Sequence, residues 1–425
     1  MSENNSSGLL VAGLFVCLAI VMGSVLINST NVTNENLPTS FADTGNLDAF
    51  GRLRVSEITS ILDVKHLYDK EPLFVDERTS GTGVATWKDT LVEMNTSASG
   101  DFVVRQTFQR AFYQNGKSQQ IMVTFDNFEP ETNIVKRIGY YSSSNDSEYH
   151  SELDGLFLSS DNGTIYTNIY HAGLLIEKTA QSEWNIDTLE DIDWEKSQIL
   201  QIDFEWLGVG RVRWGLVIDG QVVPFHETNN ANNIEGVYMA SPNKPIRWEL
   251  RQTGVGSGNF NHICATVGTE GSLNTLGVER SINTDSVPIS ATSVSEKYVL
   301  LAIRLDTETP SRVIDVLRFT LLGLSNANYY WELHLDPNVS AELNWTDLES
   351  LDVDSAIGTG ETLTSDGFIL ESGFATGRSV SSDSIDNALR LGVDLDLKPQ
   401  TLVLVATPLS PNMDIHGSLT FREIR

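Results

Sequence analysis

The sequence has few cysteines and few basic residues. Only Cys17 and Cys264 occur in 425 residues, and Cys17 lies inside an apolar run. A bridge between them would require the large domain to enter a bilayer, so we expect no disulfide framework. Lys and Arg number 28 against 57 Asp and Glu, which gives a net charge of −29. Because this charge repels phosphate backbones, we expect no nucleic-acid partner.

Motifs for catalysis and for cofactor binding are also missing from the sequence. The seven histidines show no metal-ligand spacing such as H-E-x-x-H, so zinc binding is not expected. No G-x-S-x-G nucleophile motif is present, and the glycines at 254, 256 and 258 precede no Lys-Ser/Thr pair. We therefore predict a protein that is not an enzyme and has no cofactor. A structural calcium ion is an alternative, because the carboxylates of Asp352/Asp354 and Asp394/Asp396 could supply oxygen ligands to it.

An uncharged apolar run covers residues 8–27, including Gly8, Leu14, Phe15, Ile20 and Ile27. At ~1.5 Å per residue, a helix of this length spans a ~30 Å hydrocarbon layer. No Lys or Arg precedes Arg52, whereas a signal peptide normally begins with basic residues. We predict a single transmembrane helix, flanked by a polar tail (1–7) and a linker (28–46). A cleaved signal peptide and a helix buried in an assembly are the alternatives, and the missing basic flanks leave the topology open.

Candidate glycosylation sites follow the run and recur further along the chain. The Asn-x-Ser/Thr triplets are at Asn28, Asn31, Asn95, Asn162 and Asn344, with others at Asn4, Asn5, Asn145 and Asn338. Carrying glycans would require the large domain to lie outside the cell or in a lumen.

Beyond the linker, apolar residues alternate with polar ones, which is typical of β-strands. The strongest signal is 210–227, where two strand-like runs flank Asp219-Gly220, a pair that favours a type I′ hairpin turn. We predict an all-β protein with an antiparallel β-sandwich of jelly-roll or concanavalin-like kind at 47–275. A linker at 276–297 and a second, smaller β domain at 298–425 follow. The better candidates for short helices are 184–194 and 384–391.

Several blocks resemble uncharacterised virion structural proteins of marine tailed phages and some large DNA viruses. The blocks include DAFGRLRVSE (48–57), RQTFQRAFYQNGKSQQIMVTF (105–125) and the long stretch from IDFEWLGVGRVRWG (202–215) to PIRWEL (245–250). The resemblance implies a non-catalytic part of a particle, with other virion proteins as partners and repeated copies forming a homo-oligomer. A membrane anchor is unexpected in a tailed-phage component. It favours a virion with a lipid membrane or, alternatively, a cell-surface protein.

The candidate ligand face is the strand QIDFE, on which Gln201, Asp203 and Glu205 point to one side. The string is similar to the E-x-D-x-E strand of laminarinase-like retaining glycosidases, but Gln201 cannot act as the nucleophile. A sugar-binding face and a structural polar face remain as alternatives. Exposed members of the eight tryptophans could stack on sugars, and buried ones would fill the core.

Two arginines follow on the next strand-like run. A two-residue turn would set Arg213 and Arg211 opposite His226 and Thr228, and we expect both arginines to pair with acidic residues on neighbouring strands. The overall prediction is a membrane-anchored virion structural protein. The alternative is a glycan-binding adhesin for host attachment.

Overall fold

The computed structural model describes residues 46–143, 153–273, 276–309, 311–348, 353–378 and 380–424. Within these ranges the chain is all-β, with a single 3₁₀ turn at Gln181–Glu183. No helix in the described ranges is long and apolar enough to cross a membrane. The predicted anchor, with Gly8, Leu14, Phe15, Ile20 and Ile27, lies outside the described residues, as do Asn28 and Asn31.

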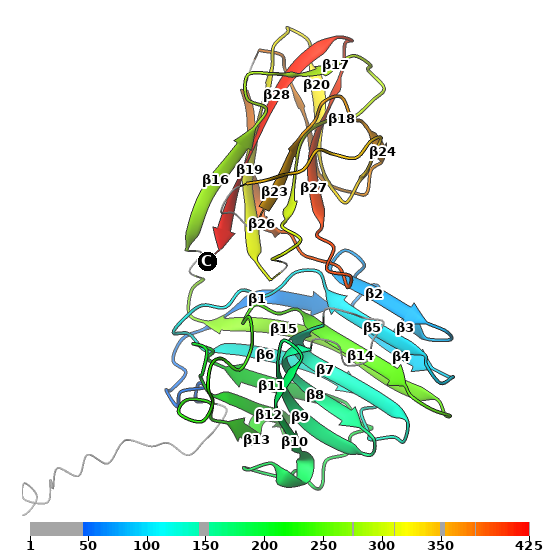
Figure 1. Cartoon of the computed structure of the whole chain (residues 1–425), viewed down its shortest axis with the longest axis vertical. Helices are drawn as coiled ribbons and strands as arrows, with labels where there is room; N and C mark the ends of the chain where they lie inside the picture. The colour runs from blue at the N-terminus through cyan, green and yellow to red at the C-terminus, as the bar shows by residue number, and fades with distance from the viewer. Residues whose placement is uncertain are drawn as a thin grey trace, which may run out of the picture. The chain divides into compact units, whose positions relative to one another are not determined.

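The first sandwich consists of two antiparallel sheets (Figure 1). The eight-stranded sheet has the order β13-β12-β11-β6-β15-β4-β3, with β1 also paired to β15. Its strands are β1 (Ile58–Lys65), β3 (Val84–Lys88), β4 (Leu91–Thr96), β6 (Gln119–Asp126), β11 (Gln198–Phe204), β12 (Val212–Ile218), β13 (Gln221–Thr228) and β15 (Gly258–Glu270).

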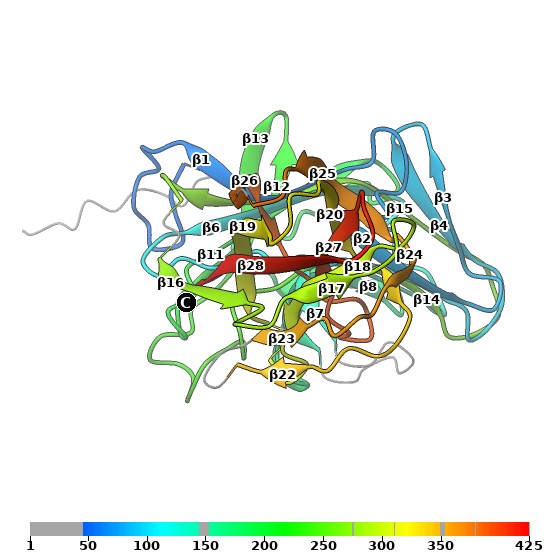
Figure 2. The same ribbon diagram turned by 90° about the horizontal axis from the view of Figure 1, so that it is seen from above.

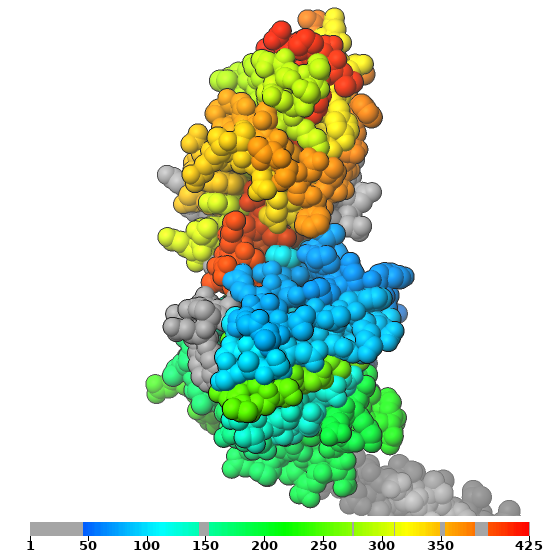
Figure 3. Space-filling view, turned by 90° about the vertical axis from the view of Figure 1, so that its right-hand side faces the viewer, coloured from blue at the N-terminus to red at the C-terminus, as the bar shows by residue number. Residues whose placement is uncertain are grey.

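The seven-stranded sheet has the order β10-β9-β8-β7-β14-β5-β2. Its strands are β2 (Val75–Ser80), β5 (Phe102–Thr107), β7 (Ile134–Ser142), β8 (Asp154–Asp161), β9 (Thr164–His171), β10 (Leu174–Ala180) and β14 (Ile246–Gln252). Segments far apart in sequence lie side by side, since β15 pairs with β1 and β4, and β14 pairs with β5. The same adjacency of blue and yellow-green segments is visible in the space-filling view (Figure 3).

Alternation along the strands builds the core of the first sandwich. On β11, Leu200, Ile202 and Phe204 are fully buried and belong to one apolar cluster with Trp248 and Leu250 of the other sheet. The neighbouring positions 201, 203 and 205 therefore point away from this core. The predicted antiparallel β-sandwich is thus present, with period-two strands packed in two layers.

The second sandwich has a separate apolar cluster, which includes Ile303, Phe319, Leu333, Leu404 and Phe421. A five-stranded sheet has the order β16-β28-β19-β26 with β17 on β28, and a six-stranded sheet has the order β22-β23-β18-β27-β20-β25 (Figure 2). A short pair, β21-β24, adds to these. The strands are β16 (Gly277–Asn283), β17 (Ile289–Ala291), β18 (Tyr298–Leu305), β19 (Val313–Gly323), β20 (Tyr329–Leu335), β21 (Asn338–Val339), β22 (Thr346–Asp347), β23 (Val353–Ile357), β24 (Leu363–Ser365), β25 (Phe368–Ala375), β26 (Val380–Arg390), β27 (Thr401–Pro408) and β28 (Met413–Ile424).

Three sequence predictions about elements are wrong. The predicted linker 276–297 contains β16 and β17, because both add to the edge of β28. The predicted helix 384–391 lies in β26, which pairs with β19. The predicted helix 184–194 is a loop in which the carboxylates of Asp187 and Asp193 accept hydrogen bonds from the backbone N–H of residues 189 and 195. Such side-chain bonds compete with helical ones.

The Asp219-Gly220 hairpin is confirmed, with φ of 52° and 76° at its two central residues. Its predicted register is wrong by one residue beyond Gly215. A bulge in β13 inserts Phe225, so that Arg213 lies opposite Glu227 and Trp214 lies opposite His226. Pro224 is beside the bulge and has no N–H for a regular ladder.

Candidate functional site

The predicted ligand face on β11 is closed. Gln201, Asp203 and Glu205 share one side of the strand, as predicted, but each is at most 2% exposed. Asp203 pairs with Arg54 and with Arg213, each at 2.6 Å, and it accepts a hydrogen bond from Ser118 Oγ at 2.6 Å. The face is therefore a structural one and offers no open surface to a ligand.

A strap formed by residues 47–54 covers this face. Its Arg52 reaches Glu205 (Nη2 to Oε2, 2.6 Å), and its Arg54 binds Asp203 and also Glu270, the latter at 3.1 Å. The strap turns at Asp48, whose Oδ1 accepts hydrogen bonds from the N–H groups of Phe50 (2.9 Å) and Arg52 (2.8 Å). The motif at 48–57 thus meets the motif at 202–213, so the two main blocks of the sequence resemblance form one ion-pair network.

The arginines of β12 complete the network. Arg213 donates to Asp203 of β11 and to the carbonyl of Leu47 in the strap. Arg211 pairs with Glu227 of β13 at 2.8 Å and donates to the carbonyl of Ala49. The prediction that both arginines pair with acidic side chains on neighbouring strands is confirmed. Burial raises the pKa of Glu205, against the opposing effect of Arg52.

The aspartate pairs considered for calcium already have partners. Asp354 binds Arg304, and Asp352 lies outside the described residues. Asp394 accepts the N–H groups of Asp396 (2.9 Å) and Lys398 (2.8 Å), while Asp396 binds Arg78. Across the described ranges, no group of three or more His, Cys, Asp or Glu side chains could hold a metal ion.

The described glycosylation triplets differ in accessibility. Asn162 is exposed at the tip of the β8–β9 hairpin, and Asn344 is exposed in the loop before β22. Asn95 is half-buried in β4, where its Oδ1 accepts a 2.7 Å hydrogen bond from Asn259.

Most tryptophans fill the two cores, as the simpler alternative predicted. The buried ones are Trp184, Trp194, Trp214, Trp248 and Trp331. Trp87 is 38% exposed, whereas Trp206 and Trp345 are half-buried. Trp206 lines a cavity of about 620 Å³. Trp345 lines a pocket of about 290 Å³ that the second sandwich forms together with Phe108, here called the Trp345 pocket.

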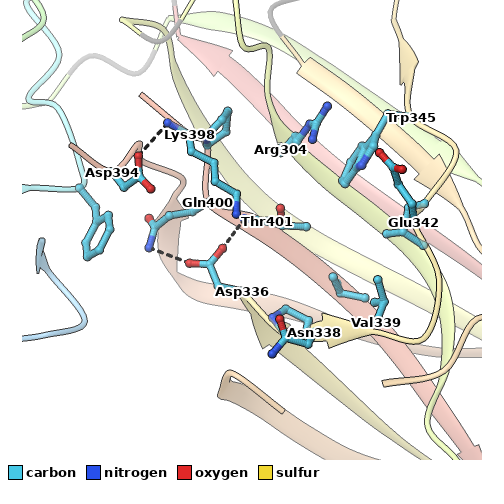
Figure 4. Close-up of a pocket in the computed structure, with 15 residues that line it drawn as sticks. Arg304, Asp336, Asn338, Val339, Glu342, Trp345, Asp394, Lys398, Gln400 and Thr401 are labelled. Atoms are coloured by element: carbon cyan, nitrogen blue, oxygen red, sulfur yellow. Dashed lines mark hydrogen bonds between the residues drawn. The ribbon is translucent and has the colours of Figure 1, made fainter. Parts of the chain in front are cut away.

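Loops at the ends of several strands build the Trp345 pocket. Asp336 follows β20, Glu342 and Trp345 precede β22, and Gln400 precedes β27. Arg304, Trp345 and Glu342 lie together on one side of the pocket, whereas Asp336, Gln400 and Asp394 lie on the other (Figure 4). The pocket thus has an aromatic wall facing a polar one.

The aromatic wall is fixed by a cation. The guanidinium carbon of Arg304 lies 4.1 Å from the Trp345 ring centroid. Arg304 is itself held by Asp354, through Nε at 2.9 Å and Nη2 at 2.8 Å. Cation–π contact and this ion pair hold the indole in place before any ligand arrives.

The polar wall is also held in place. Asp336 accepts hydrogen bonds from the N–H of Thr401 (2.7 Å) and from Gln400 Nε2 (3.4 Å). Asp394 closes the turn before β27, and burial raises the pKa of its carboxyl group. Several oxygen atoms and amide groups therefore face an immobilised indole. The sequence drew no attention to this site, because Trp345 was one tryptophan of eight and its partners come from four separate segments.

No family model matches the chain, and no curated protein matches it. Several solved structures align with about half of this chain at low identity and low TM-score. The carbohydrate recognition domain of Emp47p aligns with 13% identity over 51% of this chain and 98% of its own, at a TM-score of 0.33. A legume lectin-like domain from Entamoeba histolytica aligns with 10% identity over 50% and 98%, also at 0.33. A protein of unknown function from Shewanella oneidensis MR-1 aligns with 11% identity over 52% and 94%, at 0.35. Similarities at this level assign neither a family nor a function.

Proposed function

We propose that this protein binds carbohydrate without catalysis, and that the saccharide binds in the Trp345 pocket. The observation that carries the proposal is the fixed indole facing hydrogen-bonding groups across a 290 Å³ cavity. An aromatic ring packs against the C–H face of a sugar, while carboxylate and amide groups bind its hydroxyls. A volume near the lower end of the ~300–1,000 Å³ range of ligand pockets suits one or two sugar rings.

The carboxylates are buried or already hydrogen-bonded, which favours binding of a saccharide over its hydrolysis. Asp203 and Glu205, the pair that resembles a glycosidase strand, are buried against arginines and cannot reach a substrate. In the Trp345 pocket, Asp336 and Asp394 accept backbone N–H groups that order the loops. Carboxylates engaged in this way orient a ligand rather than transfer protons to it.

A glycan array probed with the full chain tests the proposal. We expect a restricted set of saccharides to bind, and we expect binding to disappear in Trp345→Ala. Trp87→Ala is the matched control, because Trp87 is a partly exposed tryptophan that does not line the pocket. Equal binding by wild type and Trp345→Ala would refute the location of the site, and no binding by wild type would refute the function.

A second candidate is a structural component of a virus particle, anchored in its membrane. It is favoured by the ion-pair network that joins the strap to β11 and β12, because the blocks that carry the sequence resemblance form one structural unit. Mass spectrometry of purified particles tests it, and absence of the chain from the particles would refute it. The two candidates are compatible, since a particle component can also attach to host glycans.

A further inference from the structure

Arg110 is a buried cation with no direct ion pair to any residue that the structure describes. It follows β5 and is 5% exposed. Its guanidinium forms no ion pair and no side-chain hydrogen bond anywhere in the described part of the chain, and its Nε has no partner. Burying an unpaired charge is strongly unfavourable, so a site of this kind calls for an anion.

Arg110 lines a cavity of about 250 Å³ together with a second buried cation, Lys244. The other polar lining groups are Ser142, Ser143, Ser241, Ser311 and Asp154. Lys244 binds Asp154, whose other oxygen accepts the N–H of Ala240 at 3.0 Å. The one carboxylate in this lining is therefore paired with Lys244, and it attracts Arg110 only at longer range, without a direct ion pair.

The surroundings hold the two cations in place. The N–H of Lys244 donates to Tyr140 Oη at 3.1 Å, and its carbonyl accepts the N–H of Ala111, the residue after Arg110, at 3.0 Å. The phenol of Tyr140 in turn donates to the carbonyls of Ala111 and Pro242, at 3.0 and 2.8 Å. Burial, together with the neighbouring Arg110, lowers the pKa of Lys244 to about 8. A bound anion would relieve the repulsion between the two cations.

We propose that this cavity is an oxyanion-binding site. The Arg110 guanidinium donates two parallel hydrogen bonds to a carboxylate or sulfate group, and serine hydroxyls donate to the remaining oxygen atoms of the anion. Arginine binds such groups through two parallel N–H donors. The ligand is either a free small anion or the acidic group of a saccharide. The site is separate from the Trp345 pocket and does not depend on carbohydrate binding there.

Thermal unfolding of the full chain in low-millimolar sodium sulfate or sodium glucuronate tests the proposal, with sodium chloride at equal ionic strength as the reference. We expect both anions to raise the melting temperature of the wild type and to leave that of Arg110→Gln unchanged. Glucose is the uncharged control and should have no effect. The Hofmeister effect of sulfate acts on wild type and variant alike, so the difference between them isolates the site.

Calorimetric titration of the wild type keeps the test independent of whether Arg110→Gln folds. We expect binding below about 10 mM, and at least fivefold weaker binding in Arg110→Lys, which keeps the charge but loses the fork. Binding of glucuronate alone supports an acidic saccharide, and binding of sulfate as well supports a free oxyanion. No binding of either anion, or equal binding by Arg110→Gln, would overturn the proposal.

Discussion

At the scale of single residues, the strap is held by two arginines in different environments. Arg54 has 10% of its side chain exposed and binds Asp203 and Glu270, whereas Arg52 is 51% exposed and binds the buried carboxylates of Asp48 and Glu205. Removing one partner of a buried ion pair leaves an uncompensated charge and costs about 3–5 kcal/mol, whereas an exposed pair contributes about 0–1 kcal/mol.

We therefore predict that Arg54→Met lowers the free energy of unfolding by about 3 kcal/mol. Arg52→Met should lower it by about 2 kcal/mol, because water reaches the Arg52 guanidinium although its partners Asp48 and Glu205 are buried. Urea unfolding followed by tryptophan fluorescence measures both values. Equal losses in the two variants would show that the strap is not held by the buried pair.

A second prediction concerns two buried histidines. His262 stacks on Trp248, with ring centroids 4.3 Å apart, and lies 4.6 Å from His66, whose Nδ1 binds the Ile263 carbonyl. Burial lowers the pKa of His66 to about 4 and lowers that of His262 well below its usual value, with the Arg105 guanidinium adding to both effects. Both imidazoles are therefore neutral in the folded protein at neutral pH.

Since the folded-state pKa values are lowered, the unfolded chain binds more protons below pH about 6.5. Stability is complete above that pH and falls as the pH decreases towards 4, by about 3 kcal/mol from His66 alone. Urea unfolding at a series of pH values should show this slope, and His66→Gln should flatten it. A wild-type stability independent of pH over this window would contradict the prediction.

At the scale of elements, the β12–β13 hairpin depends on its turn. Gly220 has φ +76° and open space around it, so an added Cβ meets no atom and only the backbone conformation is strained. We predict that Gly220→Ala costs about 1 kcal/mol of unfolding free energy, a value set by the left-handed conformation. Gln221→Ala, at the adjacent exposed position, should change the same free energy by less than about 0.5 kcal/mol. Chemical denaturation of the two variants makes the comparison, and a neutral Gly220→Ala would refute a strained turn.

Alternation let the strands be predicted, because a buried face leaves a period-two pattern whatever it packs against. The alternating segments 101–108, 120–125, 135–141, 164–170 and 199–206 contain or overlap β5, β6, β7, β9 and β11. The helix predicted at 384–391 was wrong, since pairing with β19 overrides the local pattern. The Trp345 pocket could not be predicted, because its walls come from loops whose proximity is set by the pairing of distant strands.

The strap that covers the candidate ligand face could not be predicted from the sequence either. The sequence correctly placed Gln201, Asp203 and Glu205 on one side of a strand. It gave no sign that Arg52 and Arg54, about 150 residues earlier, would cover them. Long-range ion pairs leave no local periodicity, so an acidic strand face looks the same whether it is open or closed.

At the scale of the whole molecule, the net charge of −29 favours expansion through self-repulsion. We predict that raising the sodium chloride concentration from about 0.01 M to about 0.15 M increases the free energy of unfolding, because the Debye length falls from about 30 Å to about 8 Å. The buried ion pairs of the strap are screened much less than the surface charges. Urea unfolding at the two salt concentrations tests this, and a decrease would mean that attractive surface pairs outweigh the net repulsion.

The negative net charge also affects which ligands the protein can bind. A strongly acidic surface disfavours polyanions, so neutral saccharides suit the Trp345 pocket, where Asp336, Glu342 and Asp394 gather. These three carboxylates outnumber the two cations of the same lining, Arg304 and Lys398, whereas Arg110 and Lys244 outnumber the single carboxylate of their cavity, which suits an acidic group.

Carbohydrate binding at Trp345 is the central claim, and calorimetric titration of a saccharide selected on the array tests it most directly. The account predicts saturable one-site binding by the wild type and by Trp87→Ala. It predicts affinity at least about tenfold weaker in Trp345→Ala, the equivalent of about 1.4 kcal/mol of lost stacking and apolar contact. Unchanged affinity in Trp345→Ala would contradict it.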